Sequence, residues 1–239
     1  MIFFISDLHL APERPDITQA FFTFLETTAK GADALYILGD FFDAWVGDDD
    51  DTPEFADITH KLKHYQSLGS SVFFMHGNRD FLVGQGFAAK TGARVLKDPC
   101  CIDLFGTKTL LMHGDSLCTQ DAEYMAFRQM VRNPQWQATI LSKPLAERKA
   151  IAAQMKATSR SMNSLKAEDI MDVTPEEVIQ TMEQHQAPLL IHGHTHRPAK
   201  HQLLINGSRA QRLVLGDWGA LGWYLLVAQD QLALCSFKI

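Results

Sequence analysis

The sequence lacks any long hydrophobic run, and this limits the class of protein it can encode. No stretch of its 239 residues reaches the ~20 uninterrupted apolar residues of a membrane-spanning helix. The first apolar run, Ile2-Phe3-Phe4-Ile5, has no basic residues before it and is too short for a signal peptide. We therefore expect a cytoplasmic protein, which could still touch a membrane surface.

Cysteine is scarce, and positive charge is not in excess. The four cysteines, at positions 100, 101, 118 and 235, show no Cys-x-x-Cys spacing, which favours free thiols in a reducing compartment. A net charge of -6 argues against a general nucleic-acid binder, because phosphate backbones require a basic face. With 46% hydrophobic and 21% charged residues, the composition is that of an ordinary globular protein. We predict one domain over residues 1–239.

Five short apolar runs each end in polar residues, and four of them at a glycine-containing turn. Such runs are typical of buried strands. The five predicted strands cover residues 2–5, 34–38, 71–75, 109–112 and 189–191.

Helical patterns over residues 17–29 and 53–68 lie between the early strands. This alternation predicts an α/β fold in which ligands gather at the carboxyl ends of the strands. From residue 202 the pattern changes to four strands, at 202–205, 211–215, 223–228 and 232–237, with turns at Asn206-Gly207 and Gln229-Asp230. We predict that these strands form a second, largely antiparallel sheet, and that the two sheets make a sandwich with helices outside.

A stretch without strand signals interrupts this order. We interpret residues 121 to about 166 as a helical insertion over the site, called the cap below, and expect another helix at Pro175 with Thr174 as its N-cap. Residues 123–166 hold eight basic and two acidic side chains, a balance of +6. The balance fits a solvated helical face. It equally fits a basic, Met-rich and aromatic cap that shelters an anionic lipid.

The polar residues that follow the strands have the chemistry of metal ligands. Asp7 and His9, like His194 and His196, stand at i and i+2, so each pair projects to one side of an extended chain. The full candidate set contains two carboxylates, one amide and four imidazoles: Asp7, His9, Asp40, Asn78, His113, His194 and His196. Oxygen and nitrogen donors without thiolates suit Mn, Fe or Zn rather than a structural zinc site. Two such ions can activate a hydroxide nucleophile and clamp a phosphate.

Other histidines are less suited to bind a metal. His76 and His192 lie inside the same motifs but off the ligand parity, so we expect them to support the site. The remaining histidines, at positions 60, 64, 185 and 201, are treated as ordinary packed or surface residues.

The motifs Asp7-x-His9, Gly39-Asp40-x-x-Asp43, Gly77-Asn78-x-Asp80, His113-Gly114 and Gly193-His194-x-His196 together resemble the signature of the calcineurin-like metallophosphoesterases. The resemblance implies a two-sheet sandwich flanked by helices. It also implies that Asp7, His9, Asp40 and His196 hold one ion, and that Asp40, Asn78, His113 and His194 hold the other, with Asp40 bridging.

One position departs from the family pattern. Many members carry His after Gly-Asn, whereas this chain has Arg79. An arginine binds phosphate bidentately but cannot act as a general acid at pH 7. This favours a substrate with a good leaving group, such as a pyrophosphate.

The motifs over residues 5–10, 76–81, 113–119, 192–198 and 215–218 resemble the branch of this family that acts in lipid A biosynthesis of Gram-negative bacteria. That branch hydrolyses UDP-2,3-diacylglucosamine to UMP and 2,3-diacylglucosamine 1-phosphate. The resemblance implies two Mn²⁺ per subunit and peripheral association with the cytoplasmic face of the inner membrane, without nucleic acid as a partner.

The same resemblance implies specific roles for individual residues. Arg79, His194 and Asp40 are the catalytic candidates, with Arg79 and His194 facing the phosphates. The substrate contacts map onto Asn78, Arg79, Asp121, Ser159, Asn163, Lys166 and His194, with Tyr124 and Lys156 as further cap candidates.

Two other functions remain open at this point. A phosphodiesterase or nuclease of the same fold would share the metal site but leave the apolar cap unexplained. A non-catalytic binding module would be expected to have lost ligands, whereas all seven are present.

Overall fold

The computed structural model describes residues 1–163 and 172–239, with side chains described through residue 158 and again from 172. A six-stranded sheet has the order β11-β10-β1-β2-β3-β4. In this sheet β1 to β4 run parallel, and β10 pairs antiparallel with both β1 and β11. Its strands are β1 (Ile2–Ile5), β2 (Ala34–Leu38), β3 (Ser71–Met75), β4 (Arg94–Leu96), β10 (Leu221–Ala228) and β11 (Gln231–Lys238).

A five-stranded sheet has the order β5-β6-β7-β9-β8. It is mixed, because β7 lies parallel to both β6 and β9, while β5 and β8 pair antiparallel at the edges. Its strands are β5 (Cys100–Leu104), β6 (Thr107–Leu111), β7 (Leu189–His192), β8 (Ala199–Ile205) and β9 (Ser208–Val214).

The predicted arrangement of the last four strands is wrong, although their positions and turns are correct. Two hairpins form as predicted, but they belong to different sheets. β8–β9 completes the five-stranded sheet, whereas β10–β11 pairs with β1. The β10 side chains explain this: Leu225 and Val227 are buried against Phe4 between the sheets, so this hairpin must lie beside the first strand.

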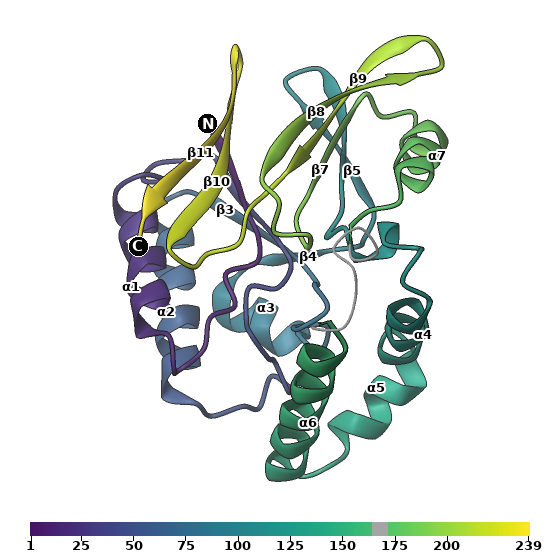
Figure 1. The fold of residues 1–239 in the computed structure, drawn as a ribbon. Helices are drawn as coiled ribbons and strands as arrows, with labels where there is room; N and C mark the ends of the chain where they lie inside the picture. Colours follow the sequence, from purple (N-terminus) through teal and green to yellow (C-terminus); the bar gives the residue numbers. More distant parts are fainter. Residues whose placement is uncertain (164–171) are drawn as a thin grey trace.

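The sheets and helices form four layers (Figure 1). Alternate residues of β1 face opposite ways: Phe3 and Ile5 pack toward the helices, and Phe4 packs between the sheets. The helices α1 (Pro15–Glu26), α2 (Pro53–Ser67) and α3 (Gln85–Thr91) cover the six-stranded sheet, and α7 (Pro175–His185) covers the other. The predicted α/β sandwich with outer helices is confirmed. The short elements α3, β4 and β5 lacked a clear sequence pattern and were not predicted.

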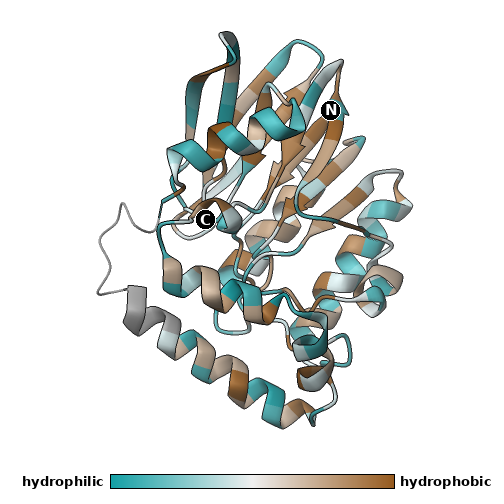
Figure 2. Cartoon of the chain, turned by 90° about the vertical axis from the view of Figure 1, so that its right-hand side faces the viewer, coloured by the Kyte–Doolittle hydropathy of each residue, from teal (hydrophilic) through white to brown (hydrophobic). Residues whose placement is uncertain are grey.

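The cap region contains three helices, α4 (Ala122–Val131), α5 (Pro134–Leu141) and α6 (Leu145–Asn163). They lie beyond the strand ends, and their hydrophobic and hydrophilic residues alternate (Figures 1 and 2). Pro134 occupies the first turn of α5, and Pro144 directly precedes α6, where a missing N–H costs nothing. Thr174 does precede α7, but its side chain makes no capping bond and accepts instead from the Thr119 hydroxyl, at 2.8 Å. Within the described residues, no helix has the length and apolar character to cross a membrane.

Candidate metal centre and active site

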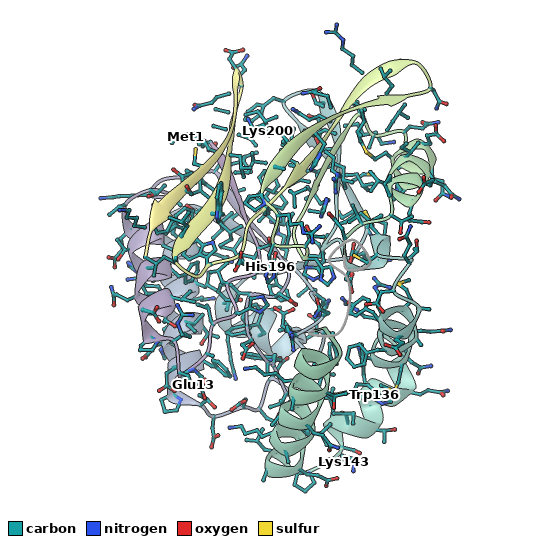
Figure 3. All side chains as sticks on the ribbon, viewed as in Figure 1. Met1, Glu13, Trp136, Lys143, His196 and Lys200 are labelled. Carbon is teal, nitrogen blue, oxygen red and sulfur yellow. The ribbon has the colours of Figure 1, made fainter. Side chains whose placement is uncertain are left out.

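The candidate ligands follow the carboxyl ends of strands from both sheets. Because β1, β2 and β3 run parallel, the segments after them meet at one edge, and β6 and β7 bring their own segments there from the second sheet. Figure 3 shows His196 at this edge, between the sheets and the cap helices. All seven predicted ligands are in this region.

Several of these residues have a left-handed backbone. The φ angles of Asp7, Asp40 and His194 are 56°, 49° and 67°, and His9 and His196 are also positive. Each such non-glycine residue costs about 1–3 kcal/mol and persists where its surroundings fix it. Main-chain bonds do so here: Asp7 N donates to Gly39 O and His9 N to Asp40 O, both at 3.0 Å.

Gly77 is required by close approach of two turns. A Cβ atom at this position would lie 2.1 Å from Asp40 Oδ1 and 2.2 Å from the Asp40 main-chain nitrogen. The Asn78 turn therefore packs directly on the Asp40 turn, and no other residue fits without moving one of them.

The first group of potential ligands comprises Asp7, His9 and His196, with donor atoms all within 4.8 Å of one another. His9 Nε2 lies 3.3 Å from His196 Nε2, and His196 Nε2 lies 3.5 Å from Asp7 Oδ1. Asp7 Oδ2 accepts from the Ser6 hydroxyl at 2.5 Å and from the His194 N–H at 2.9 Å.

The second group comprises Asp7, Asp40 and His113, again with donor atoms within 4.8 Å of one another. His113 Nε2 is 3.8 Å from Asp40 Oδ1. Asn78 Oδ1 joins this group, since it lies 3.0 Å from His113 Nε2 and 2.9 Å from His194 Nδ1. The two groups share Asp7 and are contiguous.

The donor set fits divalent cations. Asp7 Oδ1 and His9 Nδ1 are buried without a hydrogen-bond partner among the described residues, which is costly unless something else satisfies them. Buried carboxylates, an amide oxygen and imidazoles converge here, and this mixture suits Mn, Fe or Zn.

The electrostatics point the same way. Burial raises the pKa of Asp40 to about 7. Burial also opposes protonation of His113, but Asp40 and other carboxylates outweigh it and raise the His113 pKa to about 9. Burial lowers the pKa of His194 to about 3 and that of His9 to about 4, so both are neutral at pH 7. His9 and His194 are therefore already in the neutral form that binds a metal ion, whereas His113 must first lose a proton.

The two histidines predicted to support the site make backbone contacts. His76 Nε2 lies 2.7 Å from Val83 O, and His192 Nδ1 lies 2.9 Å from Gly193 O. Arg212 Nη1 lies 3.3 Å from His192 Nε2, which leaves Nδ1 to donate to the Gly193 carbonyl. These contacts hold the turns that carry Asn78 and His194.

Asp80 also holds two of the turns. Its Oδ1 accepts from Gly77 N at 2.7 Å and its Oδ2 accepts from Phe41 N at 2.8 Å. It therefore ties the Asn78 turn to the Asp40 turn. The sequence motif contained this residue, but the spacing alone did not reveal what it binds.

The predicted substrate contacts are placed in part. Arg79 and Asp121 line the same cleft as Asn78 and His194. Asp121 is also the N-cap of α4, where its Oδ1 accepts from Tyr124 N at 3.0 Å. Ser159 and Asn163 belong to α6, but their side chains lie outside the described residues, as does the whole of Lys166.

Two adjoining cavities occupy this region. The metal cleft, of about 380 Å³, is lined by ligand residues including His9, Asp40 and His196. The apolar cavity, of about 340 Å³, lies among the cap helices and is lined by hydrophobic residues including Phe127, Trp136, Ile151 and Met155. Both cavities share the wall residues Asp43, Asn78, Arg79, Tyr124 and Lys156. The metal cleft and the apolar cavity therefore adjoin each other at these residues.

A buried charge network behind the cleft was missed by sequence reasoning. Asp115 is fully buried, and its Oδ2 accepts from Tyr124 Oη and Arg128 Nε, both at 2.9 Å. The Tyr124 ring lies 5.5 Å from the His194 ring. Because Asp115 follows β6 and the other two residues belong to α4, only the folded structure brings them together. The sequence signal that could have pointed to this network was the aspartate at the end of the His113-Gly114-Asp115 motif.

Comparison with known proteins adds to this geometry. Residues 1–198 match the calcineurin-like phosphoesterase family. A protein of Cellvibrio japonicus named UDP-2,3-diacylglucosamine hydrolase is 55% identical over 236 residues, which cover 99% of this chain and 98% of that protein. Proteins with the same name from Marinobacter nauticus and Pseudomonas aeruginosa are 54% and 51% identical, covering 95% and 94% of this chain and 93% of each relative.

Proposed function

Because the chain belongs to the calcineurin-like phosphoesterase family, we propose that it is a metal-dependent hydrolase of UDP-2,3-diacylglucosamine in lipid A biosynthesis. The bond cleaved is the pyrophosphate, and the products are UMP and 2,3-diacylglucosamine 1-phosphate. One observation carries this proposal beyond general phosphoesterase activity: the polar metal cleft adjoins an apolar cavity, which suits a substrate with a diphosphate and acyl groups. In this proposal residues 1–239 act as one domain with the cap as its insertion.

The seven candidate ligands hold two divalent cations, with Mn²⁺ as the proposed metal. Asp7, His9, Asp40 and His196 serve one, and Asp40, Asn78, His113 and His194 serve the other. When bound, two such cations would supply an activated water nucleophile and neutralise charge on the phosphates. The short contacts among these donor atoms and the unpartnered Asp7 Oδ1 support a metal site formed by these residues. The two groups of donor atoms share Asp7, whereas Asp40 as the bridging residue rests on the family resemblance.

Arg79 orients the diphosphate at the wall between the two cavities. It lines both cavities, and a guanidinium can bind two phosphate oxygens at once. Because Arg79 cannot donate a proton, the departing group must leave as a stable anion, and a phosphate monoester does so. This agrees with a pyrophosphate rather than an alkyl phosphate as substrate.

The cap selects the lipid part of the substrate. The side chains of Phe127, Trp136, Ile151 and Met155 offer the acyl groups an apolar surface beside the diphosphate. Asp121, Ser159, Asn163 and Lys166 are the proposed contacts to the glucosamine and its substituents.

The protein acts at the cytoplasmic face of the inner membrane in this proposal. An acylated substrate resides in the lipid phase, and the cap exposes large apolar side chains to solvent. Met130 at the end of α4 and Leu141 at the end of α5 are 41% and 42% exposed. Such residues suit transient contact with a lipid surface.

The test is a substrate panel with purified protein and Mn²⁺. We expect UMP from UDP-2,3-diacylglucosamine and none from UDP-glucose or a cyclic nucleotide. Equal hydrolysis of UDP-glucose would show that the apolar cavity does not select the substrate. Cleavage of the cyclic nucleotide or of DNA alone would favour the phosphodiesterase or nuclease alternative.

A further inference from the structure

One arginine of the cap reaches the backbone directly before a candidate metal ligand. Arg132 stands at the C-terminal end of α4, and its Nη2 donates to the carbonyls of His76, at 3.2 Å, and Gly77, at 3.0 Å. The side chain is 21% exposed. These carbonyls belong to the turn that presents Asn78 and Arg79. The cap therefore contacts the backbone of the site as well as covering it.

The same turn is held on its other sides by residues of the body. Gly77 N donates to Asp80 Oδ1 at 2.7 Å, and Arg79 N donates to Asp40 Oδ1 at 2.8 Å. Arg132 adds the contact from the inserted helices, on the carbonyl side. Because a Cβ atom at Gly77 would collide with Asp40, the turn has almost no room to shift without disturbing the ligands.

The position of Asn78 depends on this turn. Its Oδ1 is about equally far from two histidine nitrogens, 3.0 Å from His113 Nε2 and 2.9 Å from His194 Nδ1. Arg79 follows directly and lines both cavities. A displaced Gly77 carbonyl would therefore move a metal ligand and the phosphate-binding arginine together.

Arg132 has further support that keeps it in place. Its guanidinium lies 3.8 Å from Asp115, which is itself bound by Arg128 and Tyr124 of the same helix. Since Asp115 retains those two partners when Arg132 is replaced, the substitution does not leave an uncompensated buried carboxylate. A folded variant is therefore expected.

We propose that Arg132 is a positioning residue that links cap helix α4 to the Gly77-Asn78-Arg79 turn and thereby sets metal affinity and turnover. The inference rests on the proposed function, and it extends the role of the cap from substrate selection to the metal site itself.

The experiment compares Arg132→Met, Arg132→Lys and a matched control, Arg148→Met. Arg148 is also a cap arginine bound to a body carbonyl, since its Nη1 donates to Val46 O at 2.5 Å and to Asp49 Oδ1 at 2.8 Å, but it contacts the loop after β2 instead of the Asn78 turn. Mn²⁺ affinity is measured by calorimetry, and kcat and KM are measured with bis(p-nitrophenyl) phosphate, which does not need the apolar cavity. Hydrogen exchange of the metal-free protein follows the amides of residues 76–80.

For Arg132→Met we expect Mn²⁺ affinity and kcat each to fall about tenfold or more, the magnitude typical of groups that orient metal ligands, with KM within about twofold. Exchange over residues 76–80 should become faster. Arg132→Lys, which can keep one of the two carbonyl bonds, should fall between Met and the wild type. Arg148→Met should lower Tm while Mn²⁺ affinity and exchange at residues 76–80 stay at wild-type values.

The proposal would be overturned if Arg132→Met kept wild-type metal affinity and kcat and only lowered Tm, as in Arg148→Met. Arg132 would then attach the cap to the body without affecting the metal site. Should Arg132→Met fail to fold, a lysine variant identical to wild type in metal affinity would overturn it equally. If the unsubstituted protein neither binds Mn²⁺ nor hydrolyses the diester, the proposed function fails instead, so the two failures are distinguishable.

Discussion

The metal cleft and the cap meet at one wall but are built in different ways. The cleft consists of residues at strand ends, several with left-handed backbones fixed by main-chain bonds. Asp7, Asp40 and His113 are buried, whereas His196 is 40% exposed. The cap consists of helices that attach to the loop after β2 through ion pairs, among them Arg148–Asp49, Lys149–Asp50 and Lys156–Asp43. The chemistry therefore depends on rigid placement of the ligand side chains. Recognition of a lipid requires only an apolar surface of suitable size that is attached to the body at defined points.

The largest effect should come from breaking the cleft itself. Asp40→Asn should lower hydrolysis of both the lipid and bis(p-nitrophenyl) phosphate on the order of 10³-fold, because it removes the charge proposed to be shared by both cations. Metal content per subunit should fall as well. Asp33→Asn, which changes an exposed carboxylate paired with the N-terminus, serves as the control. A fully active Asp40→Asn protein with unchanged metal content would remove Asp40 from the metal site.

The second-largest effect should come from a substitution in the wall between the metal cleft and the cap. Arg79→Ala should slow hydrolysis of both substrates about 10²-fold through loss of phosphate stabilisation. Unlike Asp40→Asn, it should leave Mn²⁺ affinity within about twofold, since Arg79 is not a proposed ligand. Steady-state rates and calorimetry separate the two variants. An unchanged rate would exclude Arg79 from catalysis.

A change inside the cap should separate the two substrates. Met155→Glu places a carboxylate in the apolar cavity, and burying an unpaired charge there opposes acyl binding. We expect KM for the lipid to rise about tenfold while the rate on the small diester changes less than about twofold. Leu204→Glu, at a 69% exposed position on β8, is the control. Equal losses on both substrates would mean that the cap serves folding rather than recognition.

The smallest effect is the release of protons when Mn²⁺ binds, and it should come from ligands of the metal cleft. The pKa of His113 is raised to about 9, so at pH 7.5 this imidazole is protonated and must lose its proton to bind a cation. His9 and His194, with pKa values of about 4 and 3, are already neutral. Mn²⁺ binding at pH 7.5 should therefore release at least about one proton, chiefly from His113 and in smaller part from Asp40 and His196, whose pKa values are also raised, and affinity should weaken as pH falls below 9. Calorimetry in buffers of different ionisation enthalpy measures this, and the absence of release would show that His113 is neutral before metal binds.

Much of the site was predictable from the sequence because its signals are local. A short apolar run followed by polar residues, in most cases with a glycine beside them, marks a strand end wherever the strand later pairs. Five such ends identified Asp7, Asp40, Asn78, His113 and His194. The structure brings these residues together, and their roles as ligands stay predictions that the variants above test. The helices of the cap were also predictable, since Pro134 and Pro144 mark where α5 and α6 begin.

Local patterns in the chain therefore identify the set of chemical groups and the elements that carry them. The folded arrangement alone places β10–β11 beside β1, forms an apolar cavity next to the metal cleft, and brings Arg132 to the carbonyls of His76 and Gly77. The cause is distance along the chain. Periodicity and turn chemistry act over a few residues, whereas β1 and β10 are more than 200 residues apart, and Arg132 lies 55 residues beyond Gly77. Such contacts are chosen by the packing of whole layers, which no local pattern encodes.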